Sequence, residues 1–104
     1  MDQEGLDPAF SVAGEMHDGR VTVTVTGEVD MATADALFQA ATPERAEGAT
    51  LDLRAVTFFD SAAIHTLIRL AERYPGALEV IPSARVRRIL DISGLGDQPW
   101  LKPA

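Results

Sequence analysis

The sequence predicts a single α/β domain in which a mixed β-sheet is crossed by helices. Two kinds of apolar pattern indicate this fold: segments in which apolar and polar residues alternate, and segments in which apolar residues recur every three or four positions. These segments follow one another in the order β-β-α-β-α-β-α, and strands that are joined through a helix pair in parallel. The chain has 104 residues, of which 46% are hydrophobic and 24% are charged. This length is sufficient for one hydrophobic core, and the composition is typical of a folded domain.

The N-terminal third predicts a lead-in followed by a β-hairpin. Residues 1–8 are polar and acidic, and we expect a flexible lead-in to a single domain over residues 9–104. A first strand is expected over residues 10–15 and a second over residues 20–26, where Val and Thr alternate. The Asp-Gly pair between them tolerates the positive φ of a tight turn. The valines should therefore face the core, and the threonines a less buried surface.

A first helix is expected to begin near Met31–Thr33, after the segment Gly-Glu-Val-Asp ends the hairpin. Asp30 or Thr33 can cap this helix, because a side-chain oxygen at that position accepts a hydrogen bond from a free N–H of the first turn. The apolar residues that follow have the spacing of one helix face: Ala34, Leu37, Phe38 and Ala41.

The central segment predicts a buried strand over residues 50–53, a short connection through Phe58 and Phe59, and a helix that begins at Asp60. Asp60 is a favourable N-cap, because its carboxylate can accept a hydrogen bond from the first turn and lies at the positive end of the helix dipole. Phe58 and Phe59 are neighbours in an extended segment, so they should point to opposite sides. We expect one of them in the core and the other at the rim of the sheet.

The C-terminal third predicts one more strand and one more helix. The strand is expected over residues 78–81, and the helix after it should be capped by Ser83 and ended by Gly94. The C-terminal tail should dock on the domain through Trp100 and Leu101. Three basic residues are expected on the solvated face of this helix: Arg85, Arg87 and Arg88.

Charge and composition exclude several classes of function. The net charge of −7 makes nucleic acid an unsuitable partner, because phosphate backbones require a basic surface. The absence of cysteine excludes disulfides, thiol catalysis and the usual zinc sites. No apolar run approaches the ~20 residues of a membrane-spanning helix. We therefore expect a cytoplasmic domain that does not insert into a membrane.

The best candidate for catalysis is the group Asp60, Ser61 and His65. Ser61 and His65 are one helical turn apart, but a working triad also needs a histidine that bridges serine and carboxylate, with an oxyanion hole beside them. Asp60 is better explained as the helix cap. Asp52 and Asp60 flank a strand end in the predicted fold and could attract a hard cation, but two carboxylates are common in such places for structural reasons. We expect no enzyme, no metal and no cofactor.

Three segments resemble the STAS domain family, which includes bacterial anti-sigma factor antagonists and the cytoplasmic tails of sulphate transporters. They are Gly-Glu-Val-Asp at residues 27–30, Asp-Leu-Arg-Ala-Val-Thr-Phe-Phe-Asp-Ser-Ala-Ala-Ile-His-Thr-Leu at residues 52–67, and Val-Arg-Arg-Ile-Leu-Asp-Ile-Ser-Gly-Leu at residues 86–95. In this family an Asp-Ser pair precedes a second hydroxyl residue, which a partner kinase phosphorylates, and then a glycine. Here the pair is followed by two alanines, so the resemblance implies that the usual switch is absent. Ser61 is the nearest hydroxyl, but one position on a helix is a rotation of about 100°.

The resemblance also implies a function in bacterial signalling through protein–protein interaction. An antagonist of this type binds an anti-sigma factor, a histidine-kinase-like ATPase, and so regulates sigma-dependent transcription. The alternative is a STAS subunit of a lipid-transport ABC-type complex, and the sequence leaves a homodimer open. Ser61 is the weak candidate for phosphorylation. The residues expected to bind the partner are Asp30, Asp60, Ser61, Ala62, His65 and Arg69.

Overall fold

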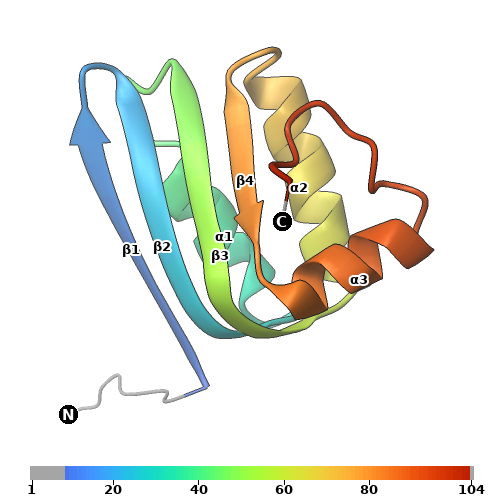
Figure 1. Cartoon of the computed structure of the whole chain (residues 1–104). Helices are drawn as coiled ribbons and strands as arrows, with labels where there is room; N and C mark the ends of the chain where they lie inside the picture. The colour runs from blue at the N-terminus through green and yellow to red at the C-terminus, as the bar shows by residue number, and fades with distance from the viewer. Residues whose placement is uncertain (1–8, 104) are drawn as a thin grey trace, which may run out of the picture.

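The computed structural model describes residues 9–103 and confirms the predicted order of elements (Figure 1). Its four strands form one sheet in the order β1-β2-β3-β4, in which β1 and β2 are antiparallel and the other two contacts are parallel. The predicted lead-in lies outside the described residues. The strands are β1 (Phe10–His17), β2 (Arg20–Val29), β3 (Gly48–Phe59) and β4 (Leu78–Pro82). The helices are α1 (Ala34–Ala41), α2 (Ser61–Arg73) and α3 (Ala84–Ile92).

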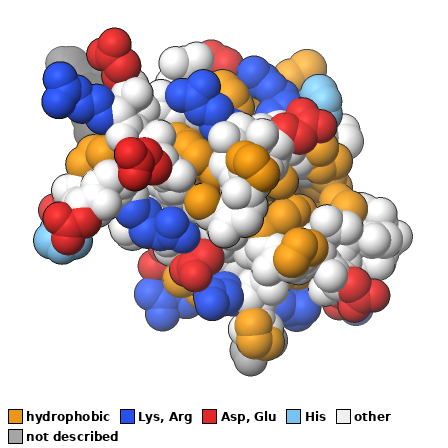
Figure 2. Space-filling model, turned by 90° about the horizontal axis from the view of Figure 1, so that it is seen from above, with side chains coloured by type: hydrophobic (Ala, Val, Ile, Leu, Met, Phe, Trp, Pro, Cys, Tyr) orange, Lys and Arg blue, Asp and Glu red, His pale blue; other side chains and the backbone are white. Residues whose placement is uncertain are grey.

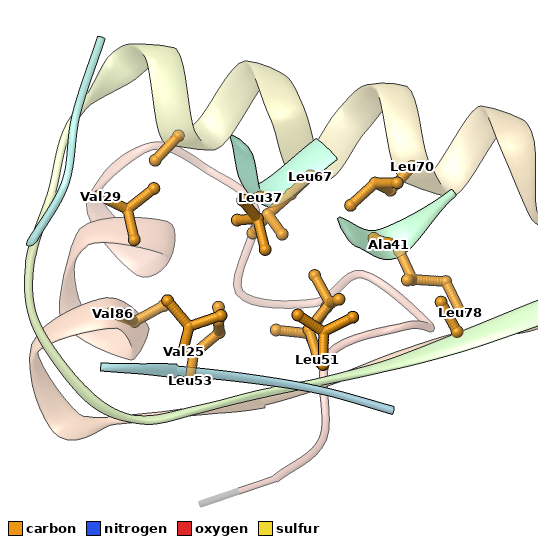
Figure 3. Close-up of a cluster of buried hydrophobic side chains, with 14 of the residues drawn as sticks. Val25, Val29, Leu37, Ala41, Leu51, Leu53, Leu67, Leu70, Leu78 and Val86 are labelled. Atoms are coloured by element: carbon orange, nitrogen blue, oxygen red, sulfur yellow. The ribbon is translucent and has the colours of Figure 1, made fainter. Parts of the chain in front are cut away.

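The core lies between the sheet and its helices. In Figure 1, α1 and α2 lie behind the sheet, and α3 begins at the carboxyl end of β4. Figure 3 shows side chains from both layers meeting, among them Leu37 of α1, Leu67 of α2 and Leu51 of β3, which are all fully buried. The valines of β2 at positions 21, 23 and 25 are buried and the threonines between them are exposed, which confirms the predicted alternation.

All four strands are longer than the sequence predicted, and β2 and β3 differ most. β2 continues through the Gly-Glu-Val segment, and β3 continues to Phe59, so the prediction of a connection at Phe58 and Phe59 is wrong. The two strands pair in parallel up to Val29 and Phe59, with register shifts after Thr24 and Gly27. These irregularities interrupt the period of two, so the end of each strand does not look like a strand in the sequence. Phe59 is 2% exposed and Phe58 is 43% exposed, which confirms that they face opposite sides.

The C-terminal strap, residues 98–102, covers the outer edge of β4. Trp100 and Leu101 are buried, as predicted. The N–H of Val80 donates to the carbonyl of Trp100 at 2.8 Å, and the N–H of Lys102 donates to the carbonyl of Val80 at 2.9 Å. Arg87 does not lie on a solvated face as predicted, because its guanidinium donates to the carbonyl of Lys102 and its Nε is buried.

No helix within residues 9–103 is long and apolar enough to cross a membrane.

Candidate partner-binding rim

The first turn of α2 is fixed by Asp60, as the sequence predicted. One oxygen of its carboxylate, Oδ1, accepts hydrogen bonds from the N–H groups of Ala62 at 2.9 Å and Ala63 at 3.1 Å. The N–H of Asp60 donates to the carbonyl of Val29 at 3.3 Å. This bond attaches the start of α2 to the end of β2, so two segments about thirty residues apart in sequence meet at one edge of the sheet.

Asp30 organises the other segment at this edge. Its Oδ1 accepts hydrogen bonds from the N–H groups of Ala32 at 2.9 Å and Thr33 at 3.2 Å. The hydroxyl of Thr33 donates to the carbonyl of Glu28 at 3.1 Å and makes no capping bond to α1. The four residues 30–33 therefore form a hydrogen-bonded turn, and α1 begins later than predicted, at Ala34. Asp30 contributes to this start through the turn, since its backbone carbonyl accepts from the N–H of Ala34.

Asp30 and Asp60 follow the ends of two adjacent parallel strands, so they belong to the same edge of the sheet. We define the rim as residues 28–33 and 58–65. Each aspartate uses only Oδ1 for the bonds described above; within residues 9–103, Oδ2 of either side chain has no hydrogen-bond partner. Both carboxylates are half-buried and keep one oxygen that a donor on another protein can bond.

The other predicted binding residues lie along α2. Ser61 and His65 are exposed, and Ala62 is half-buried. Ala62, His65 and Arg69 follow the spacing of one helix face, so the predicted stripe is a continuous part of the surface of α2. Arg69 also has an internal role: its guanidinium carbon lies 4.0 Å from the centre of the Phe38 ring, a cation–π contact that joins α2 to α1.

Asp52 does not belong to this edge, because β3 continues to Phe59, so Asp52 and Asp60 do not flank one end of the strand as the sequence suggested. The two residues are eight positions apart along β3, a separation of roughly 25 Å in an extended strand. Asp52 instead binds Arg54 through two hydrogen bonds, of 2.9 and 2.8 Å. The side-chain hydrogen bonds from Arg54 hold the pKa of Asp52 below its usual value, although partial burial opposes the shift. Within residues 9–103, no group of three or more His, Asp or Glu side chains is arranged to hold a metal ion.

The group Asp60, Ser61 and His65 does not have the geometry of a catalytic triad. The bonded oxygen of Asp60 faces the backbone of α2, and within residues 9–103 no hydrogen bond joins Ser61 to His65. The rim has a backbone fixed by hydrogen bonds and carries both polar and apolar side chains.

A small hollow of about 140 Å³ lies at the opposite end of α2, and Figure 2 looks onto that end. No residue of the rim contributes to it, so it is separate from the candidate site. It is lined by Ala71, Tyr74, Gly76, Leu78, Pro99 and Trp100.

One prominent rim residue, Met31, is not indicated by any of the sequence patterns above. Met31 lies in the turn after β2 and is 83% exposed, and no function was assigned to it. The signal available in the sequence was its position, an apolar side chain between Asp30 and the turn-forming Thr33.

Comparisons with known proteins agree with this architecture. A crystal structure of an anti-sigma factor antagonist from Mycobacterium paratuberculosis matches with 30% identity and a TM-score of 0.78, over 94% of this chain and 89% of that chain. The anti-sigma factor antagonist SpoIIAA in its unphosphorylated form matches with 23% identity and a TM-score of 0.69, over 90% and 88% of the two chains. The phosphorylated form of SpoIIAA from Bacillus matches with 22% identity and a TM-score of 0.65, over 90% and 91%. The two SpoIIAA structures support the fold alone, and no significant match was found among curated proteins.

The STAS domain family matches residues 11–104, which include every strand except the first residue of β1, all three helices and the whole rim. Together with the 30% identity to the mycobacterial antagonist, this match shows that the chain belongs to the STAS domain family.

Proposed function

We propose that this protein is an anti-sigma factor antagonist, which binds an anti-sigma factor through the rim and so frees a sigma factor for transcription. The observation that supports the proposal is the rim itself, where Asp30 and Asp60 follow the paired ends of β2 and β3, and where Oδ2 of each has no hydrogen-bond partner within residues 9–103. The similarity of this chain to an anti-sigma factor antagonist, with which it shares 30% sequence identity, supports the same function. The expected partner is a cytoplasmic ATPase of the histidine-kinase type.

Phosphorylation, which usually dissociates complexes of this family, does not control the proposed complex. Phosphorylation adds about two negative charges, which weaken a packed interface that contains no matching cation. At the family's acceptor position this chain has Ala62, whose side chain has no hydroxyl. Ser61 is exposed, but it lies about 100° around the helix axis from that position. We propose that the complex forms independently of phosphorylation and is controlled by the amounts of the two proteins.

Affinity purification followed by titration calorimetry tests the function. The tagged protein is used to capture partners from its own organism, the partners are identified by mass spectrometry, and each is then purified and titrated against the untagged protein. Direct binding of a histidine-kinase-like ATPase is the expected result. Direct binding of a membrane ATPase, with no affinity for such a kinase, would contradict the proposal and favour a transporter subunit.

A further inference from the structure

Two of the largest exposed apolar side chains of the domain lie at the rim. Within residues 9–103 the large hydrophobic side chains that remain exposed are Met16, Met31, Phe58, Ile68 and Ile92. Met31 is 83% exposed and Phe58 is 43% exposed. Exposed Met and aromatic residues are enriched where proteins bind one another, and single residues of these types contribute much of the binding energy.

The backbone holds both residues in place before any partner arrives. Met31 is two residues after Val29, and Phe58 is two residues before Asp60. Val29 and Asp60 are joined by a backbone hydrogen bond, and Phe58 itself pairs with Glu28 in the sheet. The turn around Met31 is closed by the bonds from Ala32 and Thr33 to the carboxylate of Asp30. The backbone of these two segments therefore loses little conformational entropy when a partner binds.

The charged residues of the two segments that carry Met31 and Phe58 are all acidic. Residues 27–35 and 56–64 contain no Lys or Arg. The four carboxylates of these two segments belong to Glu28, Asp30, Asp35 and Asp60. At the opposite end of the molecule, by contrast, Figure 2 shows Lys and Arg side chains intermixed with Asp and Glu. The helix α3, which carries Arg85 and Arg88, also begins at this edge, since Ser83 before it donates to the carbonyl of Val56. The acidic character therefore belongs to the two segments themselves, and a partner surface that complements them is basic.

We propose that Met31 and Phe58 are the apolar anchors of the rim, and that the anti-sigma factor presents an apolar hollow for each of them, bordered by Arg or Lys side chains. This inference rests on the proposed function, because it names the contact chemistry of that same complex. It also assigns a function to Met31 and to the rim-facing side of Phe58.

Alanine variants with matched controls test the inference. Met31→Ala and Phe58→Ala should each weaken binding of the purified histidine-kinase-like ATPase by about 10-fold or more in titration calorimetry, as is usual for hot-spot residues. Met16→Ala and Ile92→Ala remove exposed apolar side chains outside the rim, and their affinities should stay within about 2-fold of the wild type. Added NaCl should weaken binding of the wild type, since opposite charges meet at the interface.

Stability is measured beside affinity. Met31→Ala should leave the urea midpoint unchanged, so a loss of binding in that variant reports contact alone. If Phe58→Ala lowers the urea midpoint, its loss of binding could come from a loss of stability. The affinity of Met31→Ala then decides whether the apolar side chains contact the partner. If the ATPase binds the wild type and both alanine variants with equal affinity, Met31 and Phe58 are not the anchors, and the proposed function is unaffected. A wild-type protein that binds no such ATPase would overturn the proposed function, and the anchors with it.

Discussion

A negative charge at position 62 should separate binding from folding. Ala62 is the second residue of α2, and its N–H is already bonded to Asp60. In Ala62→Asp the new carboxylate gains about 0.3–1 kcal/mol from the helix dipole. It loses about 0.6 kcal/mol in helix propensity, and repulsion from Asp60 at ~6 Å costs about 0.7 kcal/mol in water. The free energy of unfolding should therefore fall by less than about 1 kcal/mol.

The effect of Ala62→Asp on the proposed complex should be much larger. The side chain of Ala62 is half-buried in the first turn of α2, which Asp60 caps, so a partner that packs on the rim encloses a second carboxylate at the same end of the helix. The basic side chains expected on the partner border Met31 and Phe58 rather than position 62, so the new carboxylate is enclosed without a cation, which costs about 2–4 kcal/mol in comparable interfaces. Because each 1.4 kcal/mol of binding free energy changes Kd tenfold, this cost weakens the affinity by roughly 30- to 700-fold.

Titration calorimetry with the purified ATPase, combined with urea unfolding of each variant, measures both quantities. Ala62→Asn is the matched control, because it has the size of aspartate without its charge. It should retain most of the affinity that Ala62→Asp loses. Equal affinities of the wild type and Ala62→Asp would refute the reasoning, and would place the interface elsewhere on the domain.

Three further outcomes are expected. Leu67→Ala should lower the free energy of unfolding by about 2–5 kcal/mol in urea melts, because Leu67 is fully buried. Ile64→Ala should lower it by less, because Ile64 is half-buried. Equal small losses in both variants would show that this face of α2 is not in the core. After incubation with the partner kinase and ATP, intact-mass measurement should find no added phosphate, and phosphate mapped to Ser61 would contradict a complex without a switch. The lowered pKa of Asp52 means that its pairing with Arg54 stabilises the fold above the ordinary carboxyl pKa of 3.8 and that this contribution is lost as the pH falls through the lowered value. Arg54→Ala should therefore be slightly less stable than the wild type near neutral pH and equal to it in strong acid. A difference that is independent of pH would contradict this assignment.

Most of the fold could be predicted from the sequence, because its signals are local. The Val and Thr alternation of β2 and the N-caps Asp60 and Ser83 each depend on residues a few positions apart, and the structure has them as predicted. The ends of β2 and β3 could not be predicted in this way. These ends are strands because β2 and β3 pair with each other there, beyond the register shifts. The alternation of apolar and polar residues within one segment does not reveal how that segment aligns with a distant one.

The candidate rim was only partly accessible to the same reasoning. The capping role of Asp60 follows from its position before a helical period, and the structure bears it out. The proximity of Asp30 to Asp60 depends on the parallel pairing of β2 with β3, which the sequence indicates only through the order of elements. The exposure of Met31 depends on the bonds that close its turn, and no residue-level pattern distinguishes an exposed Met in a turn from one that begins a buried helix. The binding functions of these residues are still predictions.

The strap gives the protein a built-in optical reporter. Trp100 is the only tryptophan of the chain, and it is 8% exposed where the strap meets β4. Its indole lines the hollow at the C-terminal end of α2, at the opposite end of the helix from the rim. Its fluorescence should therefore shift to longer wavelength when the strap detaches or the domain unfolds, while a ligand bound at the rim should leave the emission unchanged. Unfolding and partner binding can thus be followed in one sample, the first through intrinsic emission and the second through a dye placed on the partner.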